Sequence, residues 1–216
     1  MGETLTRLYL RTLQAKDRLR LRRLARRNPG LDIDPDASSN FAWASFSLAE
    51  GAVLRIGAGA VTERRRGGVR FDLGPRAEVI VGEGSWLRSD LAPVQVVAFA
   101  GARLVVGRDG FLNGCHLSAK RSLVLGRRVF VGPGSRIFDS DQHDLDDQTP
   151  ELTKPVRVGD HCWIASDVTV LRGVEIGEHS VIGARSLVTR SIPTHTLAFG
   201  SPAKPRGSVG ARSKTR

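Results

Sequence analysis

The chain has 216 residues, of which 40% are hydrophobic and 25% are charged, an ordinary globular composition that excludes disorder as the main state. Its formal net charge is +11, from 33 Lys and Arg residues against 22 Asp and Glu residues. No apolar run reaches the roughly 18 to 20 residues needed to span a bilayer, and the N-terminus lacks the apolar core of a signal peptide, so we expect a cytoplasmic protein, at most peripheral at the inner membrane surface.

The excess positive charge lies at the two ends of the chain. Residues 1–28 carry nine Arg and Lys residues against two acids, residues 204–216 carry five against none, and the middle is nearly neutral. Proteins that read nucleic acids usually interleave aromatic residues with basic ones, whereas these ends contain only Tyr9. We therefore expect no nucleic-acid partner.

A basic helix is predicted first, over residues 1–29, ending where Asn, Pro and Gly at 28–30 break the pattern. In its first half one face is apolar: Leu5, Leu8, Tyr9 and Leu13. After Lys16 the basic residues lie all round the helix. Two interpretations stay open: the first half packs on the body of the protein or on a neighbouring subunit, or the helix contacts an anionic lipid or polymer.

From residue 41 onward, short aliphatic stretches punctuated by glycine replace the helical pattern. An aliphatic residue recurs at every sixth position late in the chain, at Val158, Ile164, Val170, Ile176, Ile182 and Val188. Earlier copies of the frame pair an aliphatic residue with glycine, as at Val106, Leu125 and Val131. A coil of three short strands per turn explains this period, because the aliphatic side chain points inward and glycine allows a tight corner.

This frame resembles the hexapeptide-repeat acyltransferases, including galactoside and maltose O-acetyltransferases and polysaccharide O-acetyltransferases, from residue 41 to about 206. The resemblance implies an all-β fold, a left-handed parallel β-helix with a short N-terminal basic helix and one extruded loop. It divides the chain into a helix at 1–29, an acyltransferase domain at 30–206 and a basic flexible tail at 207–216. It also implies a homotrimer with active sites between neighbouring subunits.

The frame is interrupted in the second half by the acidic segment 139–155, which we expect to leave the coil as a loop. In the family that the sequence resembles, a histidine at the start of this loop is the general base, which here is His143. Such a base is needed because an acceptor hydroxyl is a weak nucleophile. Asp139 and Asp141 are near enough in sequence to orient the imidazole, and of the two we favour Asp141, although a backbone carbonyl would serve equally.

No metal is expected from the sequence. The acids of the loop lack the ligand and glycine positions of an EF-hand. A zinc site formed by His116, His143 and His161 would resemble the γ-type carbonic anhydrases, but these histidines do not supply the two ligands five residues apart that the family uses. Cys115 and Cys162 form no C-x-x-C pair, and we expect both to be small buried residues.

The donor is implied by three segments, WIASDV (163–168), IGARSLVTRSIP (182–193) and GSPAKPRG (200–207), whose order and spacing match the family's donor-binding run. The resemblance implies acetyl-CoA as the donor substrate. It assigns Trp163 to the wall beside the sulfur, Ser166 to the thioester, Ala184 to the pantetheine, Thr189 and Arg190 to the arm, and Lys204 and Arg206 to the phosphates. The family commonly has glycine where Ala165 and Arg185 stand, and asparagine where Ser201 stands, and the long side chain of Arg185 could alter donor choice.

On the acceptor side, Phe111, Leu112 and Asn113 resemble the F-x-N element that places an asparagine amide at the acceptor pocket. The resemblance thus implies an O-acetyltransferase that moves acetyl to a hydroxyl of a sugar or glycan, a lipid-linked glycan being one candidate. Three alternatives stay open: N-acetylation of an amino sugar, a covalent mechanism through Cys115, and a non-catalytic scaffold that binds an anionic polymer or membrane through its basic ends.

Overall fold

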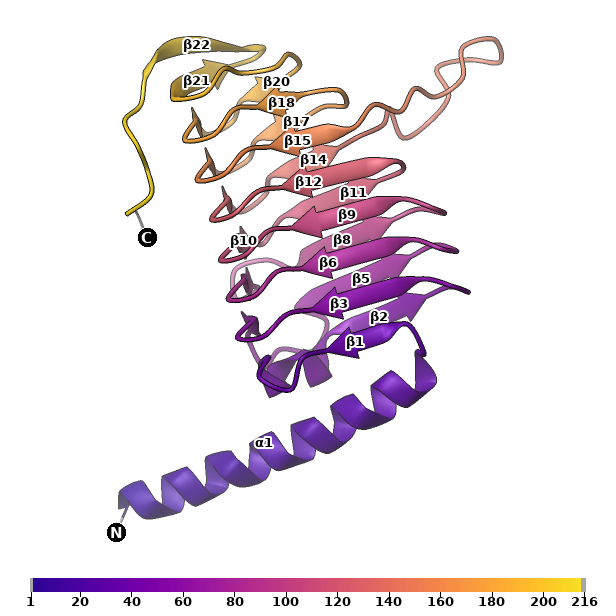
Figure 1. Cartoon of the computed structure of the whole chain (residues 1–216), viewed down its shortest axis with the longest axis vertical. Coiled ribbons are helices and arrows are strands. Elements are labelled where there is room, and N and C mark those ends of the chain that lie inside the picture. Colours follow the sequence, from indigo (N-terminus) through magenta and orange to yellow (C-terminus); the bar gives the residue numbers. More distant parts are fainter. Residues whose placement is uncertain (1, 215–216) are drawn as a thin grey trace.

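The structure, a computed structural model, describes residues 2–214, with side chains from residue 6 onward. A single long helix, α1 (Gly2–Arg27), lies below a column of short strands (Figure 1). The helix ends directly before the Asn-Pro-Gly sequence at 28–30, as predicted. A short 3₁₀ helix, η1 (Ser39–Trp43), lies beside it at the base of the column.

The strands form three sheets, which we call A, B and C. Sheet A contains β1 (Leu31–Ile33), β3 (Val53–Ile56), β6 (Glu78–Val81), β9 (Arg103–Val106), β12 (Ser122–Leu125), β15 (Val156–Val158) and β18 (Glu175–Ile176). Sheet B contains β2 (Ser45–Leu48), β5 (Val69–Leu73), β8 (Val94–Ala98), β11 (His116–Ala119), β14 (Arg136–Phe138), β17 (Thr169–Val170) and β20 (Leu187–Val188). Sheet C contains β4 (Val61–Thr62), β7 (Trp86–Arg88), β10 (Phe111–Asn113), β13 (Phe130–Val131), β16 (Trp163–Ile164), β19 (Val181–Ile182), β21 (Thr196–Gly200) and β22 (Ala203–Ser208).

From β3 to β20 each coil contributes one strand to every sheet, whereas in the first coil η1 lies between β1 of sheet A and β2 of sheet B. Along the chain the strands visit sheet A, then sheet C, then sheet B, and the next strand returns to sheet A one level higher. Neighbouring strands in a sheet pair in parallel, as β12 with β15, whereas the last two strands, β21 and β22, pair antiparallel. The structure therefore confirms a strand-dominated, parallel coil with three strands per turn and one N-terminal helix.

The six-residue frame forms the interior of the column. All six aliphatic residues of the last repeats are at most 1% exposed. They align in register from coil to coil: Val158 pairs with Ile176, Ile164 with Ile182 and Val170 with Val188. Since full burial of one such side chain contributes about 1.5 to 3 kcal/mol, each added coil is stabilised mainly by these three rows.

The corners that follow sheet A require glycine because successive coils stack closely there. A Cβ atom at Gly82 would stand 2.6 Å from the backbone of both Gly107 and Arg108. Real Cβ atoms do not approach backbone atoms so closely, so a side chain at this position would push two coils apart. The glycine of the repeat is thus explained by the spacing of the coils.

The helix packs on the body of its own chain through its second half, and the first half, expected to pack on the body or on a neighbouring subunit, does not pack on the body. Leu21 is 7% exposed and joins the core, whereas Leu8 and Tyr9 are 62% and 64% exposed. Without the helix, the core at the open end of the first coil would be exposed to water. The turn at 28–30 places the C-terminal half of α1 under that coil (Figure 1).

A buried carboxylate fixes this position. Asp17 is 3% exposed and accepts hydrogen bonds from Trp43 Nε1 at 3.0 Å and Arg64 Nε at 2.8 Å. Contacts of α1 with a neighbouring subunit or with a membrane surface both remain open. Within residues 2–214, no helix combines the length and apolar character needed to traverse a bilayer.

Candidate functional site

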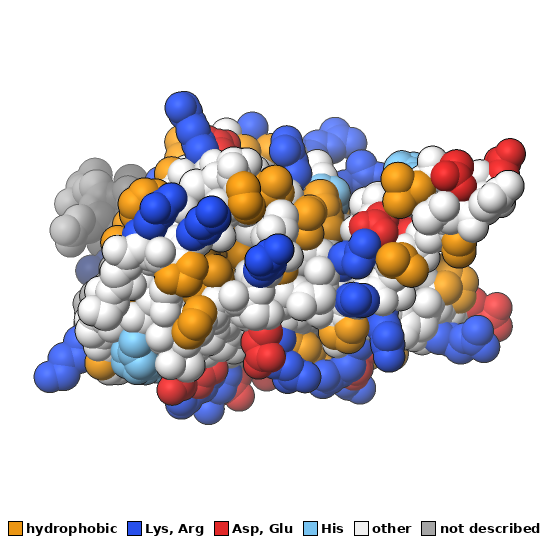
Figure 2. Space-filling view, turned by 90° about the horizontal axis from the view of Figure 1, so that it is seen from above, with side chains coloured by type: hydrophobic (Ala, Val, Ile, Leu, Met, Phe, Trp, Pro, Cys, Tyr) orange, Lys and Arg blue, Asp and Glu red, His pale blue; other side chains and the backbone are white. Residues whose placement is uncertain are grey.

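The acidic segment leaves the column as expected. Residues 139–155, which we call the extruded loop, connect β14 of sheet B to β15 of sheet A and project far from the coils (Figure 1). The loop starts and ends at the corner between sheets B and A, where Ser140 and Thr153 form an antiparallel bridge. Viewed from above, its acidic side chains project beyond a surface on which Lys and Arg side chains are frequent (Figure 2).

Asp139 anchors the first residue of this loop. Its side chain is fully buried and accepts three backbone N–H hydrogen bonds, from Lys120, Arg121 and Ser122, each at 2.7 Å. A carboxylate with its oxygens satisfied in this way is not available to a histidine in the loop. Asp139 therefore holds the coil and the loop together and does not orient an imidazole.

Asp141 lies at the edge of the loop and contacts the next coil. Its carboxylate forms an ion pair with Arg172 Nε at 2.5 Å and accepts a hydrogen bond from the Leu152 N–H at 3.3 Å. The hydrogen bond from Arg172 lowers the pKa of Asp141 below its ordinary value. No hydrogen bond joins Asp141 to His143 in the part of the chain that the structure describes, so the structure does not bring these two predicted residues into contact.

The return of the loop is held by a second ion pair. Lys120 Nζ lies 2.7 Å from Glu151 and 3.1 Å from the carbonyl oxygen of Gln142, and it packs over the ring of Phe99. The hydrogen bond from Lys120 lowers the pKa of Glu151. His143 lies between these attachments with an exposed side chain. The imidazole of His143 is therefore exposed to solvent, while both ends of the loop are fixed to the column.

Three of the predicted substrate-binding residues share the corner between sheets C and B. The Arg185 N–H donates to the Ser166 carbonyl at 2.9 Å, which places Ala184 directly above Ser166. Further down the same corner, Asn113 ends β10. Ala184 is exposed and Ser166 is half-buried, so the backbone of this corner is accessible to an elongated ligand.

Asn113 has an unsatisfied acceptor. The residue is 7% exposed, and its Oδ1 atom is buried with no hydrogen-bond partner among the described residues. A buried carbonyl without a partner costs free energy, so such an atom is more easily explained where a ligand or another chain supplies a donor. This feature fits the acceptor role that the resemblance implies for Asn113.

Trp163 lies on the outer face of sheet C and is 43% exposed. It continues a row of aromatic side chains on successive strands, in register with Phe130. The ring centroids of Trp86 and Phe111 are 5.3 Å apart and those of Phe111 and Phe130 are 5.8 Å apart. We call Trp86, Phe111, Phe130 and Trp163 the aromatic row.

The remaining predicted donor residues are divided between two places. Lys204 and Arg206 lie exposed on β22, at the upper edge of sheet C. Thr189 and Arg190 follow β20 and lie at the corner between sheets B and A, one level above Arg172. In a three-sided column this corner lies opposite sheet C, so a single chain does not bring the base of the His143 loop together with Trp163.

Both cysteines are buried and free, as expected. Burial raises the pKa of the Cys115 thiol to about 12 and that of Cys162 to about 11. A thiol in such an environment is protonated at neutral pH and therefore a poor nucleophile. The geometry disfavours the covalent alternative through Cys115.

Sequence reasoning missed Arg172 and the stacking of three histidines, of which it had named only His161. Arg172, the partner of Asp141, was not singled out, and no local signal marks it. His161, His179 and His195 stack on one another at the corner between sheets A and C. Their spacings of 18 and 16 residues are close to one coil of three six-residue repeats, and this pattern could have indicated that they share a corner. The three histidines weighed for zinc in the sequence form no such ligand group among the described residues.

The comparisons with known proteins agree with the repeat. Residues 155–190 match the family model described as bacterial transferase hexapeptide (six repeats). A Schizosaccharomyces pombe protein whose name describes an acetyltransferase is 40% identical over 104 residues, 46% of this chain and 50% of that one. The galactoside O-acetyltransferase of Escherichia coli is 28% identical over 138 residues, 62% of this chain and 66% of that one. The chain thus spans about half to two thirds of the length of these relatives.

Two solved structures share the fold. The polySia specific acetyltransferase NeuO aligns with a TM-score of 0.62 at 20% identity, over 86% of this chain and 78% of that one. The polysialic acid O-acetyltransferase OatWY aligns with a TM-score of 0.54 at 20% identity, over 77% of this chain and 90% of that one. The resemblance found in the sequence is confirmed by the family-model match and the galactoside O-acetyltransferase match, and these structures show the shared fold.

Proposed function

Because the chain carries the hexapeptide repeat of bacterial transferases, we propose that it is an acyl-CoA-dependent acyltransferase that moves acetyl from acetyl-CoA to a hydroxyl of a sugar or glycan. The observation that carries the proposal is the extruded loop, which presents His143 to solvent from a base anchored by Asp139. The likeness to a galactoside O-acetyltransferase supports oxygen in a sugar as the acceptor atom.

In the proposed reaction His143 acts as the general base. It removes the proton of the acceptor hydroxyl while the oxygen attacks the thioester carbonyl, so that a C–O bond forms as the C–S bond breaks. The proton then passes from the imidazolium to the departing sulfur, which leaves as the thiol of CoA. Asp141 and Arg172 contribute by holding the loop on the column, so Asp141 is a positioning residue in this scheme.

We place the donor along sheet C and the corner between sheets C and B. Trp163 walls the reacting sulfur, Ser166 lies near the thioester, and the exposed backbone at Ala184 follows the pantetheine. Lys204 and Arg206, whose guanidinium lies over the Phe199 ring, carry exposed positive charge for the phosphates at the upper edge of sheet C. Arg185 lies beside this track with φ of +58°, a left-handed conformation that glycine adopts more readily.

The complete site requires a second chain in this proposal. Thr189 and Arg190 lie with the loop base at the corner opposite sheet C, so His143 of one subunit would meet Trp163, Ser166 and Ala184 of its neighbour. A homotrimer of left-handed coils satisfies this requirement, and the half-exposed aromatic row supplies apolar surface for subunit contact. The domain division is proposed as helix 1–29, catalytic domain 30–206 and tail 207–216.

The acceptor side is proposed to include Asn113, whose unpartnered Oδ1 would accept a hydrogen bond from a sugar hydroxyl. An amino sugar would satisfy the same atom, so N-acetylation remains the alternative within this class. For a lipid-linked glycan, the exposed Leu8, Tyr9 and basic residues of α1 would attach the enzyme to the cytoplasmic face of the inner membrane. Cosedimentation with anionic vesicles that persists only at low salt would support this attachment, whereas recovery in the soluble fraction at every salt concentration would contradict it.

The variant His143→Ala tests the mechanism. Release of free thiol from acetyl-CoA is measured with galactosides, maltose and oligosialic acid as acceptors, and we expect His143→Ala to lose at least about 100-fold in rate while binding acetyl-CoA normally. The matched control is Leu145→Ala, a substitution at a 74% exposed residue of the same loop, which should retain activity. Transfer that survives in His143→Ala would contradict the mechanism, and a wild-type protein that binds no acetyl-CoA would favour the scaffold alternative.

A further inference from the structure

Three histidines form a column at the corner between sheets A and C. His161, His179 and His195 occupy equivalent positions on successive coils, each with a left-handed backbone at φ of +60°, +59° and +54°. Their rings stack with centroid distances of 4.8 Å between each successive pair. This corner is not part of the proposed catalytic loop.

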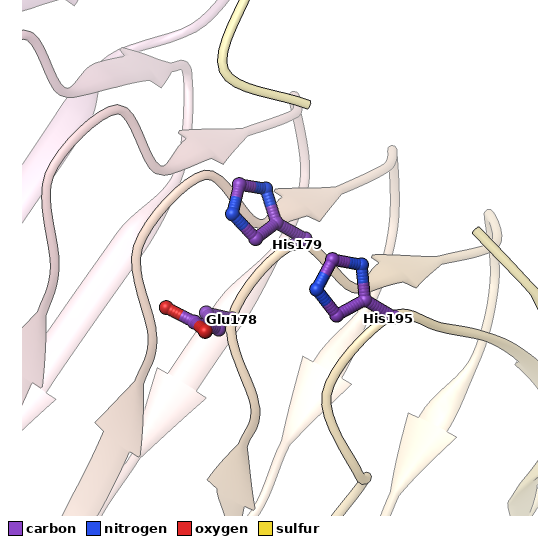
Figure 3. Close-up of side chains that lie close together, drawn as sticks. All are labelled: Glu178, His179 and His195. Atoms are coloured by element: carbon purple, nitrogen blue, oxygen red, sulfur yellow. The ribbon is translucent and has the colours of Figure 1, made fainter. Parts of the chain in front are cut away.

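A carboxylate lies beside the upper two rings. Glu178 precedes His179 at the corner, and Figure 3 shows the two imidazoles next to each other with the Glu178 carboxylate close to them. The ligand atoms of Glu178, His179 and His195 all lie within 4.8 Å of one another. Two imidazoles and one carboxylate are a donor set that suits zinc and related divalent transition metals.

The ligand atoms of Glu178, His179 and His195 can reach a common ion by rotation of their side chains. Bonds of about 2.1 Å in a tetrahedral site hold neighbouring ligand atoms about 3.4 Å apart, and the ligand atoms of these three residues lie within 4.8 Å of one another. Glu178 is exposed and forms no ion pair among the described residues, so its carboxylate is free to rotate toward the rings. The nearby Asp160 is already paired with Arg127 at 2.9 Å. Glu178 is therefore the carboxylate that remains available at this corner.

The C-terminal segment forms a hydrogen bond with each of the two rings, His195 and His179. His195 Nδ1 lies 3.2 Å from the Val209 carbonyl oxygen, so a proton on Nδ1 is donated there and Nε2 keeps its lone pair for a metal. His179 Nδ1 instead accepts the N–H of Arg212 at 3.0 Å. An ion that binds His179 at Nδ1 must displace the Arg212 N–H. An ion that binds at Nε2 instead moves the ring proton to Nδ1, where it faces the Arg212 N–H and the hydrogen bond between them is lost.

We propose that Glu178, His179 and His195 form a binding site for a divalent transition-metal ion such as Zn²⁺, with water as the remaining ligand. The ion joins the last two coils to each other and competes with Arg212 for His179. The proposed site differs from the expectation of no metal drawn from the sequence. It does not depend on the proposed acyl transfer, since none of its three ligands is assigned to that reaction.

Calorimetric titration of the full-length, chelator-treated protein with ZnCl₂ tests the site. We expect one ion per chain at micromolar strength, and we expect His195→Ala and Glu178→Gln each to weaken binding at least about tenfold. The matched controls are His116→Gln, on sheet B, and Glu175→Gln, three residues before Glu178, and both should bind as the wild type does. Circular dichroism without metal confirms that each variant is folded.

Thermal unfolding gives a second readout. Zn²⁺ should raise the melting temperature of the wild type and of both controls, because the ion binds the folded state, and should leave that of His195→Ala unchanged. The proposal is overturned if the wild type binds no Zn²⁺, if His195→Ala binds as tightly as the wild type, or if His116→Gln weakens binding as much as His195→Ala does.

Discussion

At the scale of single residues, the side chain of Asp139 attaches the extruded loop to the backbone of the coil beneath it. It is fully buried, and its two oxygens satisfy three consecutive backbone N–H groups of the turn between β11 and β12. Removal of the carboxylate takes the acceptor away from three part-buried N–H groups, and a hydrogen bond to a charged group contributes about 1.5 to 3 kcal/mol. The residue thus connects the start of the loop to the coil beneath it.

The substitution Asp139→Ala should therefore lower the free energy of unfolding by at least about 3 kcal/mol. Urea unfolding followed by circular dichroism measures the loss. Asp147→Ala, in the exposed part of the same loop, is the control and should change stability by less than about 0.5 kcal/mol. Equal unfolding midpoints for the two variants would show that the three hydrogen bonds do not stabilise the fold.

The cysteines give a second prediction at this scale. Because burial raises the pKa of Cys115 to about 12 and that of Cys162 to about 11, neither thiol is ionised at pH 8 in the folded protein. We expect iodoacetamide to leave both unmodified in native protein and to label both in urea, as read by mass spectrometry. Rapid labelling of native Cys115 would reopen the covalent mechanism.

At the scale of elements, the extruded loop depends on charge for its attachment. Arg172 and Lys120 bind Asp141 and Glu151, and each cation lowers the pKa of its carboxylate. A carboxyl group whose folded pKa lies below its unfolded value contributes stability above the unfolded pKa and loses it as the pH falls through the folded value. The unfolded pKa values lie near 4, so the attachment is complete at neutral pH.

Hydrogen exchange should consequently show protected amides at the base of the loop at pH 6 and a loss of that protection below about pH 4. The variant Arg172→Gln removes one of the two cations, and its loop should exchange faster than the wild-type loop already at pH 6. Protection that stays the same across this pH range, or in Arg172→Gln, would mean that the ion pairs do not hold the loop.

The elements also show where sequence reasoning succeeds and where it stops. The six-residue period predicted the buried rows at Val158, Ile164 and Val170, because the interior of a coil is set by local spacing. The docking of the second half of α1 on the first coil was not predicted, since it depends on Asp17 meeting Trp43 and Arg64, which lie far along the chain. The partner of Asp141 was missed for the same reason: Arg172 follows it by 31 residues, with no local pattern.

At the scale of the whole molecule, the three faces of the column differ. Sheet A carries a charged outer ladder in which Glu78 pairs with both Arg55 and Arg103, as expected of a face in contact with water. Sheet C instead carries the aromatic row, whose Trp86 and Trp163 are 42% and 43% exposed. Apolar side chains on an outer face favour contact with another chain.

The assembly that this asymmetry supports is testable. Sedimentation should give a mass close to three times 23.4 kDa, and the specific activity should fall as dilution dissociates the trimer, since the proposed site lies between chains. The variant Trp86→Glu, which places a charge in the aromatic row, should sediment as a folded species of lower mass. A wild-type monomer with full activity would contradict a shared site.

The most direct test of the proposed function is calorimetric titration of the trimer with acetyl-CoA, compared with dephospho-CoA and with the variant Lys204→Ala. It requires no knowledge of the acceptor. We expect micromolar binding of acetyl-CoA that weakens when the 3′-phosphate or the Lys204 side chain is removed, because that charge meets a phosphate of the donor. No detectable binding by an intact trimer would contradict the proposed acyltransferase function and point to a scaffold that acts through its basic ends.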